Sequence, residues 1–340
     1  MAIQQLLIQL LFIFFLSFFG YFLLNKYAQK LKLIAVPVNR SSHTQEIPTG
    51  FGVIIFFSCL LSTLVLKPVF LYENIYCFIA IFLILTLGVL DDIKNYKPII
   101  KVLIPILAYL FLYIDGLQIE GLGIYLGHTI ELNNVGSIIF TLFALVAYTN
   151  AFNLIDGIDG LSGSLGIIVL SAFAYIGYSN HDEFLIILPI IFISSLFVFM
   201  IFNWNPAKIF LGNSGSLMIG FLITLLGIKS LDYIQPVSIL YIAAIPIFDS
   251  IIVFFRRIQK KQHPFKPDKK HLHHIILSYM GQDISKTIFI MALIQIFFSI
   301  LGIIIISNVS DSFFPLLIII ILLFLVYFFT LNYQESNTSN

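Results

Sequence analysis

The sequence predicts an all-α, polytopic integral membrane protein in which residues 1–340 form a single transmembrane domain. Three observations support this prediction: 59% of the residues are hydrophobic, only 10% are charged, and the apolar residues fall into long runs. A helix needs about 20 apolar residues to cross the hydrocarbon core of a bilayer. The chain is therefore not a pair of soluble domains, and it has room for about eleven transmembrane helices.

Eleven apolar stretches are the candidate transmembrane helices. They lie at roughly residues 3–25, 51–66, 74–90, 99–114, 135–152, 161–178, 184–202, 209–228, 235–255, 287–306 and 313–331. The first stretch is too long for a signal peptide, has no basic residue before it and is followed by lysines, so we expect it to be retained as a span. Pro105, Pro189 and Pro246 lie inside spans and predict kinks rather than breaks.

The basic residues predict the orientation of the chain. If the connections alternate sides, 16 of the 18 Lys and Arg residues fall on the odd-numbered side and only Lys67 and Lys229 on the other. Cytoplasmic loops carry an excess of Lys and Arg, so the N-terminus is predicted outside and the C-terminus in the cytoplasm. Residues 26–50 are the first cytoplasmic loop, 256–286 a basic, His-rich cytoplasmic loop, and 334–340 a short disordered tail.

Net charge and cysteines exclude two further classes of protein. The formal net charge is +1, which indicates no nucleic-acid partner. Cys59 and Cys77 both lie inside apolar runs, where a free thiol is usually buried. The sequence therefore predicts no disulfide framework.

Two adjacent carboxylates, Asp91 and Asp92, follow the third apolar stretch in the string LGVLDDIKNYKP. Adjacent carboxylates at a helix end are able to reach one cation together, and their mutual repulsion raises the pKa of one of them and prepares it as a base. A carboxylate pair is also a common way for a helix to leave the membrane. The string alone is compatible with a catalytic pair and with a plain helix stop.

The string NAFNLIDGIDGLSG, residues 150–163, is more specific. Two Asn and two Asp alternate with Gly157 and Gly160, so the backbone is able to bend tightly while four oxygen-bearing side chains stay within one short turn: Asn150, Asn153, Asp156 and Asp159. Such a set suits Mg²⁺, which takes a few carboxylates together with water and phosphate oxygens. The spacing is not that of an EF-hand. An ordinary turn rich in Asn and Asp is the alternative.

Two further segments have the composition of phosphate sites. Residues 210–221, FLGNSGSLMIGF, place small residues at a predicted helix start, where free backbone amides favour an anion. Residues 255–274 hold seven basic residues and four histidines, and His271 and His274 share a helical face next to His273. The alternative for this basic loop is topogenic charge or attraction to anionic lipids, which explains the lysines but not the HLHH string.

Taken together and in this order, the strings resemble the polyprenyl-phosphate N-acetylhexosamine-1-phosphate transferases, glycosyl transferase family 4. The resemblance runs from about residue 36 to residue 275, and eleven spans are more similar to the WecA and TagO branch than to the ten-span MraY branch. The matching positions are Asp91 and Asp92 for the paired aspartates, Asn153, Asp156 and Asp159 for NxxDGxDGL, Asn203 for the asparagine before GDxGS, Asp249 for PxxD, and 264–274 for the histidine loop.

The resemblance implies a reaction. A lipid phosphate attacks the β-phosphorus of a UDP-N-acetyl-sugar, which releases UMP and begins the synthesis of a cell-surface polysaccharide such as O-antigen or teichoic acid. The implied cofactor is Mg²⁺, with Mn²⁺ as the alternative, and the implied partners are undecaprenyl phosphate, the UDP-sugar and membrane lipids. The expected sugar is GlcNAc or a related deoxy-amino sugar. The implied location is the bacterial inner (cytoplasmic) membrane, with the active site on the cytoplasmic face, and a homodimer is left open.

The resemblance also implies roles for the matching residues. Asp91, Asp92, Asp156 and Asp159 form the expected catalytic set, with Asp91 or Asp92 as the base. The expected metal ligands are Asp156, Asp159 and Asn213, and the expected substrate-binding residues are Asn153, Asn203, Asp249, Arg256, His271, His273 and His274.

The sequence departs from the family pattern at two places. GDxGS reads GNSGS here, so Asn213 replaces an aspartate expected to bind magnesium, and metal affinity should fall unless another carboxylate compensates. The Arg-Gly-Gly-Gly run of the first loop is Thr49, Gly50, Phe51 and Gly52. A catalytically impaired member of the family is therefore one alternative. A transporter or lipid-binding membrane protein is another.

Overall fold

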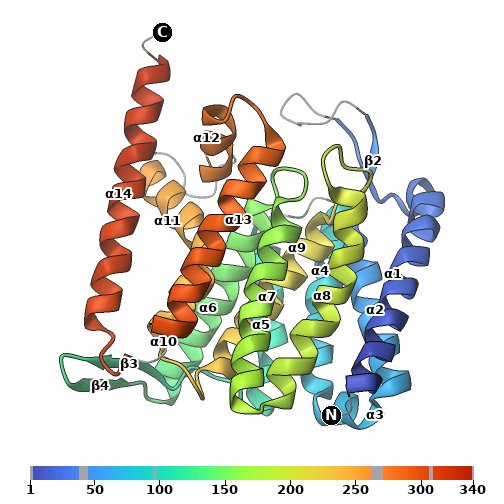
Figure 1. The fold of residues 1–340 in the computed structure, drawn as a ribbon, viewed down its shortest axis with the longest axis horizontal. Helices are drawn as coiled ribbons and strands as arrows, with labels where there is room; N and C mark the ends of the chain where they lie inside the picture. Colours follow the sequence, from blue (N-terminus) through green and yellow to red (C-terminus); the bar gives the residue numbers. More distant parts are fainter. Residues whose placement is uncertain are drawn as a thin grey trace.

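The computed structural model describes residues 3–37, 45–94, 96, 98–261, 271–305 and 309–338. The chain folds into a bundle of long helices whose first and last members lie at opposite sides (Figure 1). These are α1, Ile3–Leu31, and α14, Phe313–Thr338. The helix α1 begins and α14 ends at opposite ends of the bundle, as an odd number of crossings requires.

Every predicted span coincides with a helix or with a pair of helices. Between α1 and α14 lie α2 (Phe51–Leu66), α3 (Pro68–Glu73), α4 (Ile75–Lys94), α5 (Pro98–Ile114), α6 (Asn134–Ile155), α7 (Leu161–Asn180), α8 (Glu183–Asn203), α9 (Gly212–Ser230), α10 (Pro236–Ile242), α11 (Ala244–Gln259), α12 (Leu272–Tyr279), α13 (Ile284–Ile300) and a π-helical turn, η1 (Leu301–Ile305). The all-α fold of a multi-pass membrane protein is confirmed.

The number of crossings stays a prediction. Within the described part of the chain, eight helices are long and apolar enough to cross a membrane, and a bent pair brings the number to nine. The two remaining candidates, α2 and residues 100–114 of α5, are shorter apolar helices. The helix α14 continues to Thr338, so it includes most of the segment 334–340 that was predicted to be a disordered tail.

Two small antiparallel hairpins were not predicted. The strands β1 (Ile34–Ala35) and β2 (Ile47–Pro48) pair at the end of the bundle that also holds α12 (Figure 1). The strands β3 (Gly121–Tyr125) and β4 (His128–Glu131) pair at the other end. Their two-residue turn, Leu126 and Gly127, has positive φ at both positions, which is the backbone geometry typical of a tight hairpin.

The span predicted at 235–255 is broken rather than kinked. The helices α10 and α11 meet at an angle of 88°, so the prediction of a simple kink at Pro246 is wrong. Pro246 has no N–H to donate to the carbonyl of Ile242, and the ladder of backbone hydrogen bonds stops there. Pro105 and Pro189, in contrast, lie inside continuous helices.

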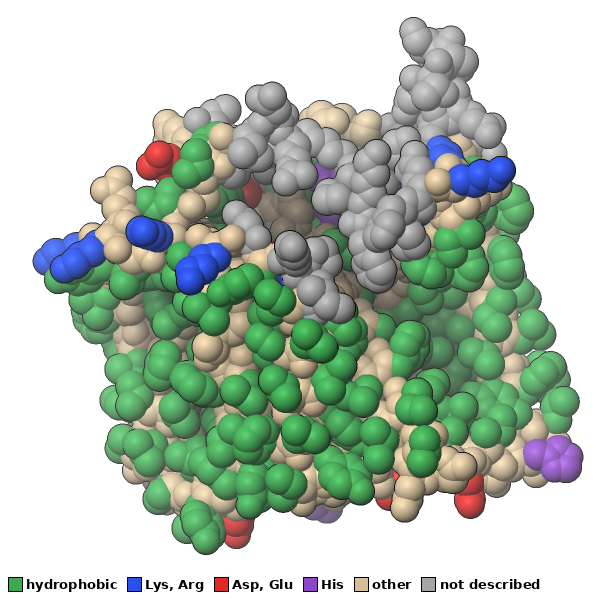
Figure 2. Space-filling model, turned by 180° about the vertical axis from the view of Figure 1, so that it is seen from behind, with side chains coloured by type: hydrophobic (Ala, Val, Ile, Leu, Met, Phe, Trp, Pro, Cys, Tyr) green, Lys and Arg blue, Asp and Glu red, His purple; other side chains and the backbone are tan. Residues whose placement is uncertain are grey.

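The helix α9 lies at the centre of the bundle and packs against α2, α4, α6, α7 and α8. Most of it is buried, whereas α1 and α14 expose most of their apolar surface. Figure 2 shows the outer surface as a broad apolar belt, with the visible Lys and Arg side chains along its upper rim. This rim is at the α12 end of the bundle, which the positive-inside rule predicts to face the cytoplasm.

Two predicted loops lie partly outside the described residues. Residues 38–44, which include Arg40 and His43, and residues 262–270, which include His263, are in these gaps. The described remainder of the first loop holds the end of α1 and the β1–β2 hairpin, and that of the second holds the end of α11 and all of α12.

Candidate active site

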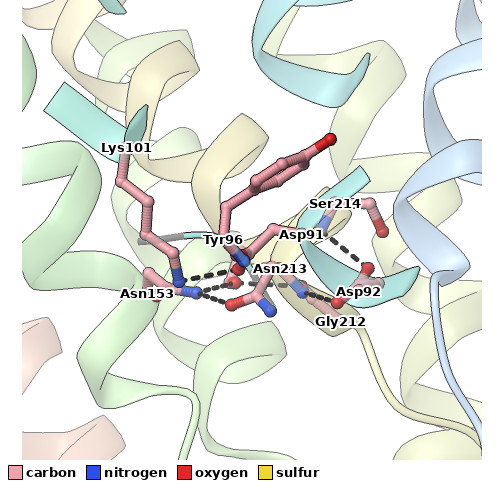
Figure 3. Close-up of polar contacts among 9 residues, drawn as sticks. Asp91, Asp92, Tyr96, Lys101, Asn153, Gly212, Asn213 and Ser214 are labelled. Atoms are coloured by element: carbon pink, nitrogen blue, oxygen red, sulfur yellow. Dashed lines mark hydrogen bonds and ion pairs between the residues drawn. The ribbon is translucent and has the colours of Figure 1, made fainter. Parts of the chain in front are cut away.

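The paired aspartates at the end of α4 point to different partners (Figure 3). Asp91 is buried, and its two oxygens are engaged: Oδ1 accepts from the backbone N–H of Tyr96 at 2.8 Å, and Oδ2 lies 2.7 Å from Nζ of Lys101. A buried carboxylate needs such partners because its desolvation is costly. The ion pair with Lys101 and the hydrogen bond from Tyr96 therefore hold the side chain of Asp91 in place.

Asp92 caps the start of α9. Its Oδ1 accepts from the backbone N–H of Asn213 at 2.7 Å and its Oδ2 from that of Ser214 at 3.1 Å. The first amides of a helix have no intrahelical acceptor, and the helix dipole favours a negative charge there. The sequence predicted a phosphate at this helix start, and in the structure the carboxyl group of Asp92 occupies it (Figure 3).

Glycines bring the start of α9 into backbone contact with α2 and α4. A Cβ atom on Gly52 would lie 2.3 Å from the backbone nitrogen of Gly215, and one on Gly88 would lie 2.3 Å from Cα of Ser214. Gly212 has a φ of +74°, which a larger residue rarely adopts. This backbone packing fixes the position of Asn213.

Asn153, in the last turns of α6, reaches the same point. Its Nδ2 donates to Oδ1 of Asn213 at 2.9 Å and to Oγ of Ser216 at 2.7 Å (Figure 3). The side-chain oxygen of Asn213, the expected metal ligand, therefore already accepts one hydrogen bond. A carbonyl oxygen has two lone pairs, so it keeps capacity for a second partner.

The turn between α6 and α7 holds Asp156 and Asp159, each with one oxygen engaged. Oδ1 of Asp156 accepts from Oγ of Ser162 at 2.5 Å, and Oδ2 of Asp159 accepts from Nδ2 of Asn205 and the N–H of Ala207, both at 3.0 Å. Burial, together with the negative charges of Asp92 and Asp159, raises the pKa of Asp156 to about 6, although the hydrogen bond from Ser162 lowers it. The three carboxylates are therefore electrostatic neighbours.

Asn203 supports this turn. It is buried at the end of α8, its Oδ1 accepts from the N–H of Gly160 at 2.8 Å, and its Nδ2 donates to the carbonyl of Ile209 at 2.7 Å. Gly160 has a φ of +76°, so the tight turn that the glycines predicted is present. Both polar atoms of Asn203 contact backbone, and its substrate-binding role stays a prediction.

Asp249 joins α11 to the His-rich loop. It is fully buried, its Oδ2 lies 2.6 Å from Nδ1 of His271, and its Oδ1 accepts from the N–H of Leu272, the first residue of α12. One carboxylate therefore orients a histidine and caps a helix. Arg256 is buried about two turns further along α11.

His273 reaches the turn that holds the two aspartates. It is buried, and its Nε2 would lie 2.3 Å from a Cβ atom on Gly157. Neither ring nitrogen has a hydrogen-bond partner among the residues that the structure describes. Burial lowers the pKa of His273 to about 3, more than the charge of Asp249 raises it, so the ring is neutral. The ring centroids of His271 and His274 lie 5.6 and 4.3 Å from that of His273.

The donor set fits Mg²⁺ with few protein ligands. No group of three His, Cys, Asp or Glu side chains in the described ranges lies close enough to hold a metal ion. Mg²⁺ is usually held by one or two carboxylates, with water and phosphate oxygens at its other positions. Asp156 is repelled by the negative charges of Asp92 and Asp159, and a bound cation would relieve this repulsion.

Comparison with known proteins identifies the family. Glycosyl transferase family 4 matches residues 74–231. A Haemophilus influenzae protein named "Undecaprenyl-phosphate alpha-N-acetylglucosaminyl 1-phosphate transferase" is 31% identical over 278 residues, which cover 77% of this chain and 78% of that protein. The chain belongs to glycosyl transferase family 4. The predicted resemblance is confirmed.

Two further relatives cover similar shares of this family 4 chain. A Bacillus subtilis protein named "Probable undecaprenyl-phosphate N-acetylglucosaminyl 1-phosphate transferase" is 29% identical over 290 residues, 84% of this chain and 80% of that protein. An Escherichia coli protein with the same name as the Haemophilus one is 28% identical over 277 residues, 79% and 75% of the two chains. The family match covers the site from Asp91 to Asn213, and the histidines lie beyond it.

The structure adds residues to this family 4 site that the sequence did not single out. Lys101 pairs with Asp91, Ser162 with Asp156, and Asn205 with Asp159. In the sequence, Lys101 contributed only to the charge count that predicts the orientation, and Ser162 only to a glycine-rich string. Neither residue lies at a spacing from its aspartate that would predict a contact, so the contacts become visible only in the fold.

Proposed function

We propose that the chain transfers an N-acetylhexosamine-1-phosphate, GlcNAc-1-phosphate first among the candidates, from a UDP-sugar to undecaprenyl phosphate. The names of the relatives support the lipid acceptor and the sugar. The observation that carries the proposal is the gathering of carboxylates from α4 and the α6–α7 turn, the amide of Asn213 from α9 and a buried, neutral histidine from α12 at one end of the bundle.

The site must bring two anions together. At 4 Å and an effective dielectric constant near 20, each pair of like unit charges repels by about 4 kcal/mol. Phosphoryl transfer is catalysed mainly by positioning and by charge stabilisation. Asp156 and Asp159 would hold Mg²⁺, with Asn213 as a neutral ligand, and the bound ion would neutralise charge on the diphosphate.

The residues of the chain would then act as follows. Asp92, the carboxylate of the pair that interacts with Asp156, accepts the proton of the lipid phosphate. The freed phosphate oxygen forms a bond to the β-phosphorus, the bond from the β-phosphorus to the bridging oxygen breaks, and UMP leaves with that electron pair. Asp91, held by Lys101, keeps the end of α4 in place. His273 donates its N–H to a diphosphate oxygen, and Arg256 binds the same phosphates.

The proposed location follows from the same geometry. The lipid tail stays in the bilayer, its phosphate lies at the interface, and the nucleotide arrives from the cytosol. The site lies at the α12 end of the bundle, where Figure 2 shows the visible Lys and Arg side chains. This arrangement supports our proposal that the active site faces the cytoplasm at the bacterial inner membrane and that the reaction is the first step in the synthesis of a cell-surface polysaccharide.

A direct assay tests the proposed function. Purified protein is mixed with undecaprenyl phosphate, Mg²⁺ and a panel of UDP-sugars, and released UMP is measured. UDP-GlcNAc or a related deoxy-amino sugar should give UMP, and the Asp156→Asn variant should not. Absence of Mg²⁺-dependent UMP with every sugar would contradict the proposal. Binding of the lipid without turnover would then favour an impaired member of the family, and solute uptake into proteoliposomes without UMP would favour a transporter.

A further inference from the structure

The break between α10 and α11 leaves two backbone groups without helical partners. In a continuous helix the N–H of residue 246 would donate to the carbonyl of Ile242, but Pro246 has no N–H. Ile245 lies in the first turn of α11, where amides have no acceptor in their own helix. Inside an apolar span each such group is costly unless another residue satisfies it.

Gln295, from α13, satisfies both groups. Its Nε2 donates to the carbonyl of Ile242 at 2.7 Å, and its Oε1 accepts from the N–H of Ile245 at 3.1 Å. Oγ of Ser299, one turn further along α13, donates to the same carbonyl at 3.1 Å. Gln295 is fully buried. One side chain therefore joins the last turn of α10 to the first turn of α11.

The same face of α13 continues to Gly302. A Cβ atom there would lie 2.7 Å from the side chain of Ile242 and 2.9 Å from the carbonyl oxygen of Ser238. Gln295, Ser299 and Gly302 are four and three residues apart, which is the spacing of one helix face. The bend is therefore fixed from one side by α13 and its π-helical turn.

The direction of α11 determines where Asp249 lies. Asp249 is four residues after Ile245, and it holds His271 and the first amide of α12. The helix α12 in turn carries His273 to Gly157, in the turn between Asp156 and Asp159. A continuous series of contacts therefore leads from Gln295 to the candidate active site.

We propose that Gln295 is a positioning residue: by holding the 88° bend it sets the direction of α11 and, through Asp249, places His273 against the turn of the two aspartates. The catalytic consequence rests on the proposed function. Gln295 does not itself touch the reacting atoms. It acts through the backbone of the break.

The test measures the accessibility of His273 directly. Purified protein is treated with diethyl pyrocarbonate, and the modified histidines are identified by mass spectrometry. His273 is 1% exposed, whereas His128 and His181 are exposed at the other end of the bundle and serve as internal references. UMP release is measured on the same samples. The variants are Gln295→Leu, the milder Ser299→Ala, and a matched control, Gln9→Leu.

Gln9 is the control because it is an equally buried glutamine in α1, and its amide atoms have no hydrogen-bond partner in the described part of the chain. Gln295→Leu should increase the modification of His273 about tenfold and reduce turnover about tenfold to a hundredfold, because buried backbone groups lose their partners. Ser299→Ala should change both about threefold, because it removes one of two donors to Ile242. Gln9→Leu should change neither.

Unchanged His273 modification in both Gln295→Leu and Ser299→Ala would overturn the proposal. Faster modification with unchanged turnover would also overturn it, because the position of His273 would then have no catalytic effect. The modification assay needs no turnover. Wild-type protein that releases no UMP would therefore count against the proposed function alone, and the response of His273 would still decide whether Gln295 holds it in place.

Discussion

Because Gly157 has no side chain, the imidazole of His273 is able to pack against its backbone. The Gly157→Ala variant tests whether this close packing matters for activity. The added Cβ would lie 2.3 Å from Nε2 of His273, and ordinary contact begins near 3.4 Å, so the imidazole must retreat by about 1 Å. A displacement of about 1 Å in a catalytic group costs on the order of a hundredfold in rate. We therefore expect kcat/KM to fall about a hundredfold.

The assay is UMP release from a UDP-sugar and undecaprenyl phosphate, with the thermal midpoint measured on the same protein. The midpoint should change little, because the atom that must move is at the far end of a side chain. Gly166→Ala in α7 is the control, because its nearest neighbours would be 3.5 Å away, and it should keep full activity. The double variant Gly157→Ala, His273→Ala should be no slower than His273→Ala alone. Wild-type kcat/KM in Gly157→Ala would refute the reasoning.

Three further predictions concern the carboxylates. Lys101→Met should lower stability by about 1–2 kcal/mol relative to Lys101→Arg in thermal unfolding, because Asp91 loses its cation, although Lys101 is 22% exposed. An equal midpoint for both variants would contradict this. Asn213→Asp should lower the Mg²⁺ concentration for half-maximal rate, and an unchanged Mg²⁺ titration would count against Asn213 as a ligand. Because the pKa of Asp156 is raised to about 6, the carboxylate takes up a proton as pH falls through 6. The Mg²⁺ concentration for half-maximal rate should then rise about tenfold per pH unit below 6. If this concentration does not change with pH, Asp156 is not a ligand.

The sequence predicted the elements that local patterns control. Long apolar runs placed the helices, since a span needs only length and apolarity. The glycines of the α6–α7 turn predicted a tight bend, and Gly160 has the left-handed backbone that this requires. Gly157 has a different role, because it makes room for His273, which is more than a hundred residues away in the chain. No pattern around Gly157 contains that information.

Contacts between distant segments account for the differences. Pro246 predicted a kink, but a break of 88° is stable because Gln295 on another helix satisfies the freed backbone groups. The start of α9 predicted a phosphate site, but Asp92 from α4 accepts its first amide hydrogens. Asn203 matched a family position, and only the fold shows that both its polar atoms contact backbone.

The close approach of Gly52 and Gly88 to the first turn of α9 limits how the protein can be re-engineered. On that side the site is bounded by backbone atoms, and replacing a side chain by a smaller one does not remove backbone atoms. A mutant library designed to accept a bulkier substrate would therefore gain no space on that side. The imidazoles of His271 and His273 are side chains, so substitution there is able to change the shape of the site.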